Sequence, residues 1–173
     1  GGVIALLYAL TYAPSYLTGV IVTSPALKLY ASFSPLAVAF ARIAATLFPG
    51  LKGDPLNPRF LSRDPAVVAA YTSDPFCYRG GLPAAAAIKL VRSQKEVTAS
   101  LSRLKIPLLI LHGTDDKLAS IEGSRLLYQQ AGSSDKSIRY YEGFYHELLN
   151  EPHKERVITD ILTWLDDRAK SVA

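Results

Sequence analysis

Two short polar segments of the chain carry residue types that can transfer protons. Asp116 lies in the segment His-Gly-Thr-Asp-Asp, directly after the apolar run 106–111, and His146 lies in Gly-Phe-Tyr-His, soon after the run 138–141. If both runs are parallel strands, the two side chains lie beyond the same edge of the sheet, where functional groups gather. An imidazole there can remove a proton from a hydroxyl group, and a buried carboxylate fixes the tautomer of the ring. The sequence therefore predicts an Asp–His pair suited to nucleophilic catalysis.

Other roles compete with catalysis at these positions. Asp116 could cap a turn, since Asp and Gly favour turns, and its neighbour Asp115 is the rival candidate for the acid. His146 on a loop could be a solvated or packed histidine. Structural or exposed positions are expected for His112 and His153, and Cys77 is expected to be a packed thiol or part of a pocket wall.

The pair needs a nucleophile, and none is evident in the chain. No serine stands in Gly-x-Ser-x-Gly, the strained turn that presents the nucleophile of many serine hydrolases. The chain instead opens with Gly1 and Gly2 and an apolar helical run, which is the pattern expected after the serine of Gly-x-Ser-x-Gly-Gly. We therefore interpret Gly1 as the last glycine of this elbow and expect the nucleophile two residues before it. On this interpretation the chain is the C-terminal part of a longer protein.

The periodicity of apolar residues predicts the elements that would hold these groups. Short runs rich in β-branched and aliphatic residues predict strands buried on both faces, and amphipathic stretches predict helices. Their alternation predicts an α/β fold with a parallel sheet and right-handed crossovers. Asn150 is expected to cap the last helix, with Glu151 in its first turn. The predicted strands are 17–23, 106–112 and 138–141, and the predicted helices are 1–13, 121–131 and 152–169.

A long segment, 27–104, interrupts this alternation. It is too long for a simple connection, and it contains an apolar stripe and two further predicted helices, 64–71 and 83–101. The stripe either packs against the domain below, or forms a lid that lines an acyl-chain tunnel or contacts a membrane surface. We therefore divide the chain into a core, 1–26 and 105–173, and a helical cap, 27–104. The stripe consists of Leu36, Phe40, Ile43 and Leu47.

The composition excludes several classes of protein. A chain of 173 residues with 49% hydrophobic and 20% charged residues fits one globular domain. Its 19 basic residues are dispersed, so no nucleic-acid-binding stripe is expected. One cysteine and three histidines make an internal disulfide and a structural zinc site implausible, and no metal or organic cofactor is expected. The apolar start, 1–13, is too short to span a bilayer and is followed by Pro14.

Six segments carry a resemblance to a known family: 1–10, 23–26, 62–65, 71–75, 110–116 and 141–147. In this order and spacing they resemble monoacylglycerol lipases of the α/β-hydrolase superfamily. The resemblance implies a Ser-Asp-His triad in which Asp116 is the acid and His146 is the base, with Gly1 and Gly2 as the remnant of the elbow. It also implies that the insertion is the lipase cap, with Tyr71 near the glycerol-binding end of the pocket. The cap residues expected to contact the acyl chain are Leu36, Phe40 and Ile43.

The resemblance implies that the intact protein hydrolyses a monoacylglycerol to a fatty acid and glycerol, whereas this chain alone, without the serine, is inactive. The alternatives are a lysophospholipase, carboxylesterase or aminopeptidase of the same superfamily, and an inactive piece that works only with a partner chain. The expected partners are the lipid ester and, through the cap, a membrane surface, with no nucleic acid. The oligomeric state stays open, and the cytoplasm or the membrane periphery is the favoured location.

Overall fold

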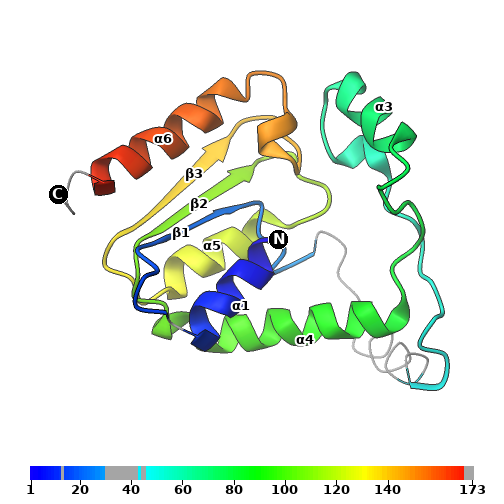
Figure 1. Ribbon diagram of the computed structural model, residues 1–173, viewed down its shortest axis with the longest axis horizontal. Coiled ribbons are helices and arrows are strands. Elements are labelled where there is room, and N and C mark those ends of the chain that lie inside the picture. Colours follow the sequence, from blue (N-terminus) through cyan, green and yellow to red (C-terminus); the bar gives the residue numbers. More distant parts are fainter. Residues whose placement is uncertain (13, 30–42, 44–45, 170–173) are drawn as a thin grey trace.

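Three parallel strands form the central sheet of the molecule, in the order β1-β2-β3 (Figure 1). The computed structural model describes residues 1–12, 14–29, 43 and 46–169. The strands are β1 (Val20–Thr23), β2 (Leu108–Gly113) and β3 (Lys136–Tyr141). The predicted α/β class and the three parallel strands are therefore confirmed. Strand β2 begins two residues later than expected because Pro107 has no N–H group to add to the ladder.

The central strand β2 is buried along its whole length and divides the core into two clusters. Leu108 and Ile110 pack into one cluster, and Leu109 and Leu111 pack into the other, on the opposite face of the sheet. This separation follows from the period of two residues in a strand, which sends successive side chains to opposite faces. The continuous apolar run in the sequence of β2 is therefore typical of a strand covered on both faces.

Helices cover both faces of the sheet (Figure 1). α1 contributes Leu6 to the first cluster and α5 contributes Leu127, whereas α6 contributes Val157 and Trp164 to the second cluster. The Ser120 side chain caps α5 by accepting a hydrogen bond from the N–H of Glu122. The bounds of these helices are α1 (Gly2–Tyr12), α5 (Ile121–Gln130) and α6 (Glu155–Ala169).

The insertion between β1 and β2 carries short helices that lie to one side of the sheet and one long helix below it (Figure 1). Asp64 caps α3 by accepting from the N–H of Ala66. The long helix α4 packs along α1, and Val97 and Leu101 join the first core cluster. The elements are η1 (Pro58–Phe60), α3 (Pro65–Ser73), α4 (Ala84–Ser100) and η2 (Leu101–Arg103).

The start of the last helix differs from the prediction. α6 begins at Glu155, and Asn150 ends the short helix η3 (Leu148–Asn150) instead of capping α6. The reason is the backbone of His153, whose φ of 66° is left-handed and cannot belong to an α-helix. Glu151 consequently lies outside the helix, where its buried side chain pairs with Arg63.

Part of the apolar stripe of the insertion falls outside the described residues, namely Leu36 and Phe40. Ile43 and Leu47, which are described, are exposed. Among the helices that the structure describes, none is long and apolar enough to cross a membrane.

Candidate active site

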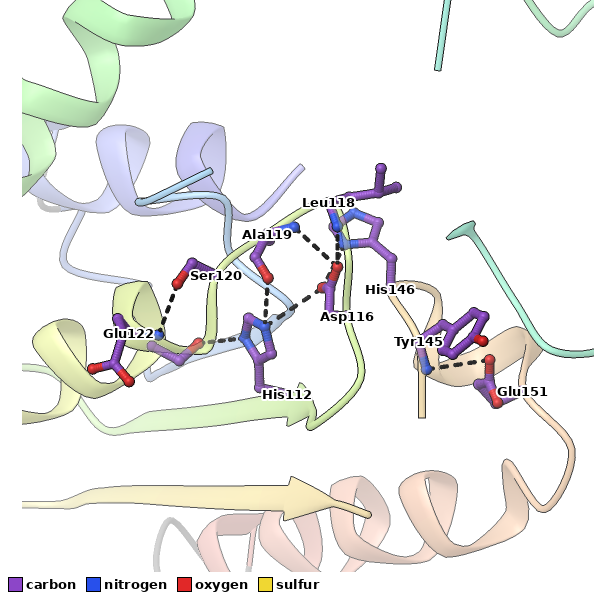
Figure 2. A network of polar contacts seen from close by, with 10 residues as sticks. His112, Asp116, Leu118, Ala119, Ser120, Glu122, Tyr145, His146 and Glu151 are labelled. Carbon is purple, nitrogen blue, oxygen red and sulfur yellow. Dashed lines mark hydrogen bonds and ion pairs between the residues drawn. The ribbon is translucent and has the colours of Figure 1, made fainter. Parts of the chain in front are cut away.

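The structure brings Asp116 and His146 into direct contact at the carboxyl edge of the sheet (Figure 2). Asp116 lies in the turn that follows β2, and His146 lies in the loop that follows β3. Because these strands are parallel neighbours, their carboxyl ends bring the two side chains together. His146 Nδ1 lies 2.8 Å from Asp116 Oδ2. A carboxylate can only accept, so Nδ1 carries the proton and Nε2 is the ring nitrogen left to receive one.

Hydrogen bonds hold the Asp116 carboxylate in one orientation. Oδ1 accepts from the backbone N–H groups of Leu118, at 2.7 Å, and Ala119, at 2.9 Å. Burial raises the pKa of Asp116, but the hydrogen bond and charge of His146 and the two N–H groups outweigh burial, so the pKa is lowered. The carboxylate is therefore ionised at neutral pH, with its side chain 1% exposed, whereas the His146 side chain is 27% exposed.

A second histidine, His112, lies next to the Asp116 carboxylate (Figure 2). Its Nε2 lies 3.2 Å from the carbonyl oxygen of Ala119 and 3.5 Å from Asp116 Oδ2, so Nε2 carries the proton. Its Nδ1 then accepts from the hydroxyl of Ser124, at 2.7 Å. Burial lowers the pKa of His112 more than the charge of Asp116 raises it. His112 is thus a neutral, fully buried histidine that adds a donor near the carboxylate.

Gly113 allows the end of β2 to approach the loop that carries His146. A Cβ at Gly113 would lie 2.3 Å from the carbonyl oxygen of Phe144 and 2.5 Å from that of Tyr145. Both contacts are with backbone, so the loop would have to move. The N–H of Asp115 donates to the same Phe144 oxygen at 3.0 Å, which ties the two segments together.

We expect Gly113→Ala to lower the free energy of unfolding by about 1–3 kcal/mol, because the added methyl group overpacks this contact. Urea denaturation followed by circular dichroism measures the change. Gly50→Ala is the matched control, because nothing lies within 4 Å of a Cβ at Gly50. An equal effect of the two substitutions would contradict the close approach at Gly113.

A cavity of about 470 Å³ lies beside His146. Its wall includes Gly1 and Gly2 at the start of α1, Ser24 at the end of β1, and the loop that carries His146. Ser24 is buried and has a φ of 43°, an uncommon backbone conformation for a serine, of the kind that often marks functional sites. The start of α1 and the imidazole thus face one cavity.

The other residues singled out from the sequence occupy different positions. Tyr71 lies on α3, where its hydroxyl donates to the carbonyl oxygen of Tyr78, and it is not among the described residues that line the cavity. Asp115 is exposed, and the contact with His146 is made by Asp116. His153 is exposed and Cys77 is partly buried. The substrate-contact roles of Tyr71, Leu36, Phe40 and Ile43 stay predictions.

Two contacts around the Asp116–His146 pair have no local signal in the sequence. Ser124 bonds to His112, 12 residues earlier, and the buried Glu151 pairs with Arg63, 88 residues earlier. Within the described ranges, no three or more His, Cys, Asp or Glu side chains cluster in a way that could hold a metal ion.

The fold and the Asp–His pair define part of an α/β hydrolase, and comparison with known proteins gives the family. Residues 1–153 match the family described as serine aminopeptidase, S33, so the chain belongs to this family. It is 36% identical over 165 residues to the monoacylglycerol lipase of Mycolicibacterium smegmatis, covering 95% of the chain and 59% of that protein. It is 34% identical over 175 residues to human monoglyceride lipase, covering 97% of the chain and 56% of that protein.

Solved structures agree with this assignment. The crystal structure of Paleococcus ferrophilus monoacylglycerol lipase matches 97% of the chain and 65% of its own length, with a TM-score of 0.87 and 31% identity. A soluble variant of the Saccharomyces cerevisiae monoglyceride lipase, in complex with a substrate analogue, has the same fold, with a TM-score of 0.81 and 23% identity. The chain spans less than two thirds of the length of these relatives.

Proposed function

We propose that this chain supplies the acid and the base of a Ser-Asp-His triad that hydrolyses monoacylglycerols. The observation that carries the proposal is the hydrogen bond from His146 to a buried, ionised Asp116, made beside a cavity that the start of α1 also lines. Similarity to monoacylglycerol lipases over nearly the whole chain supports the substrate class.

In the proposed reaction, a serine two residues before Gly1 attacks the ester carbonyl. Nε2 of His146 takes the proton of the serine hydroxyl as the new C–O bond forms, and it gives this proton to the glycerol oxygen as the ester bond breaks. A water molecule then attacks the acyl-serine ester, and Nε2 of His146 takes its proton. The proton returns to the serine oxygen as the fatty acid leaves. Asp116 holds Nδ1–H throughout and stabilises the imidazolium that forms. The chain by itself, lacking that serine, is proposed to be inactive.

The N-terminus of α1 is suited to bind negative charge. Its first turn faces the cavity, contains no acidic residue, and offers the backbone N–H groups that every helix leaves unpaired at its beginning. The helix dipole adds partial positive charge at this end. These groups are suited to stabilise an oxyanion close to the serine, a contribution often worth about 10²–10³-fold in rate for each donor.

The insertion supports a lipid substrate. Exposed apolar side chains gather between residues 43 and 51, a surface expected to receive an acyl chain or to touch a membrane. Leu36 and Phe40, the other members of the apolar stripe and predicted substrate contacts, lie outside the described residues. The exposed apolar residues of this surface are Ile43, Leu47, Phe48 and Leu51.

A substrate panel tests the proposed function. The chain joined to its upstream coding sequence is assayed with a monoacylglycerol, a lysophospholipid, a short p-nitrophenyl ester and an aminoacyl p-nitroanilide. We expect the highest kcat/KM for the monoacylglycerol. Preference for the anilide would instead support aminopeptidase activity, which the family description raises. Activity on none of the four would contradict hydrolysis and favour an inactive piece that needs a partner chain.

A further inference from the structure

One ion pair, between the buried Glu151 and the part-exposed Arg63, joins the insertion to the loop that carries His146. The Glu151 side chain is 0% exposed, and its Oε2 accepts from Arg63 Nε at 2.6 Å. Its Oε1 accepts from the backbone N–H of Arg63, at 2.8 Å, and from that of Tyr145, at 3.3 Å. Figure 2 shows Glu151 beside Tyr145, the residue that precedes His146. The carboxylate therefore connects Arg63 of the insertion to the backbone of the residue that precedes the proposed base.

The residue after His146 is held by the same stretch of the insertion. The N–H of Glu147 donates to the carbonyl oxygen of Leu61 at 2.9 Å. His146 thus lies between two anchored amides, one bonded to Glu151 and one bonded to Leu61. Since Leu61 and Arg63 are two residues apart, a shift of this stretch would displace the backbone on both sides of the imidazole.

Two further contacts secure this arrangement. The buried hydroxyl of Ser62 donates to the carbonyl oxygen of Asn150 at 2.7 Å. The guanidinium of Arg63 lies 5.0 Å from the centre of the Phe144 ring, within the range of cation–π attraction. Residues 61–63 therefore contact the His146 loop at its beginning, its middle and its end.

We propose that the Arg63–Glu151 pair is a positioning device, which sets the orientation of His146 from the insertion. The inference rests on the proposed role of His146 as base. Burial of the Glu151 carboxylate is what makes it suitable, although the Arg63 side chain is 36% exposed. A desolvated carboxylate with three donors has one favourable geometry, whereas a carboxylate in a fully exposed ion pair adopts many. Arg63 and Glu151 do not touch reacting atoms, so they act through the His146 loop.

The experiment compares Glu151→Gln and Arg63→Lys with the starting protein, expressed with its upstream sequence. Glutamine keeps the shape of the side chain but replaces one acceptor by a donor, and lysine keeps the charge but not the planar guanidinium. The exposed pair Arg125–Glu122, three residues apart on α5, provides the matched control Glu122→Gln. The readouts are kcat and KM for the preferred ester, and the proton NMR signal of His146 Nδ1–H.

We expect Glu151→Gln to lower kcat about 10–100-fold with KM within about twofold, because small displacements of a catalytic group are costly in rate. The Nδ1–H signal should broaden or move, Arg63→Lys should lie between Glu151→Gln and the starting protein, and Glu122→Gln should match the starting protein. An unchanged signal together with unchanged kcat in folded Glu151→Gln would overturn the proposal. If Glu151→Gln does not fold, Arg63→Lys decides by the same two readouts. If no ester is hydrolysed at all, the proposed function fails, and the NMR signal alone decides the positioning role.

Discussion

His146→Ala is expected to lower kcat for the preferred ester about 10⁴-fold or more in the protein expressed with its upstream sequence, which is proposed to supply the serine. The substitution removes the only group proposed to carry the proton between the serine and glycerol, while the cavity and the helix N-terminus remain to bind the substrate. KM should therefore change much less than kcat. Steady-state hydrolysis of a monoacylglycerol, measured as released fatty acid, gives both constants.

His153→Ala is the matched control for this prediction. His153 is an exposed histidine seven residues further along the chain, and it lies outside the wall of the cavity beside His146. The kcat of His153→Ala should stay within about twofold of the kcat of the starting protein. Activity near the starting value in His146→Ala would remove His146 from the mechanism.

Asp116→Asn is expected to lower kcat about 10³–10⁴-fold with little change in shape. The carboxylate of Asp116 accepts from His146 Nδ1–H, whereas an asparagine amide can turn its N–H₂ towards the ring and favour the opposite tautomer. Nε2 would then carry the proton and could not accept one from the serine. Asp115→Asn is the matched control, since Asp115 is exposed and Asp116 makes the contact with the ring. Equal losses in the two variants would contradict the assignment of Asp116 as the acid.

The same substitution should change how stability depends on pH. The pKa of Asp116 is lowered in the folded protein, so its ionised form contributes stability above the unfolded pKa of about 4. That contribution is lost as the pH falls through the folded pKa. The difference in free energy of unfolding between the starting protein and Asp116→Asn should thus be largest at neutral pH and shrink in acid. Urea denaturation at pH 7 and at pH 3 measures it, and a difference independent of pH would contradict this electrostatic account.

Sequence patterns were sufficient to predict the sheet and the contact at its edge. The run from Leu108 to Leu111 has no polar interruption, which is typical of a strand covered on both faces. Once that strand and its neighbour are parallel, topology alone brings Asp116 towards His146. The prediction needed no knowledge of side-chain geometry, because the two loops leave adjacent strand ends.

Features that depend on distant contacts or unusual backbone angles could not be predicted in this way. Glu151 looked like the first turn of a helix, since nothing near it in sequence indicates its partner Arg63, 88 residues earlier. His153 adopts a left-handed angle that a non-glycine residue rarely shows, so the delayed start of α6 had no local sign. A tertiary contact, the ion pair with Arg63, accounts for the position of Glu151.

Reaction with a fluorophosphonate, which modifies activated serines, tests the central claim most directly. The protein that includes the upstream sequence is treated with the probe, digested and examined by mass spectrometry. We expect one modified serine, two residues before Gly1, with labelling at least about 10³-fold slower in His146→Ala. Modification of a different residue, or labelling of His146→Ala at the starting rate, would contradict it.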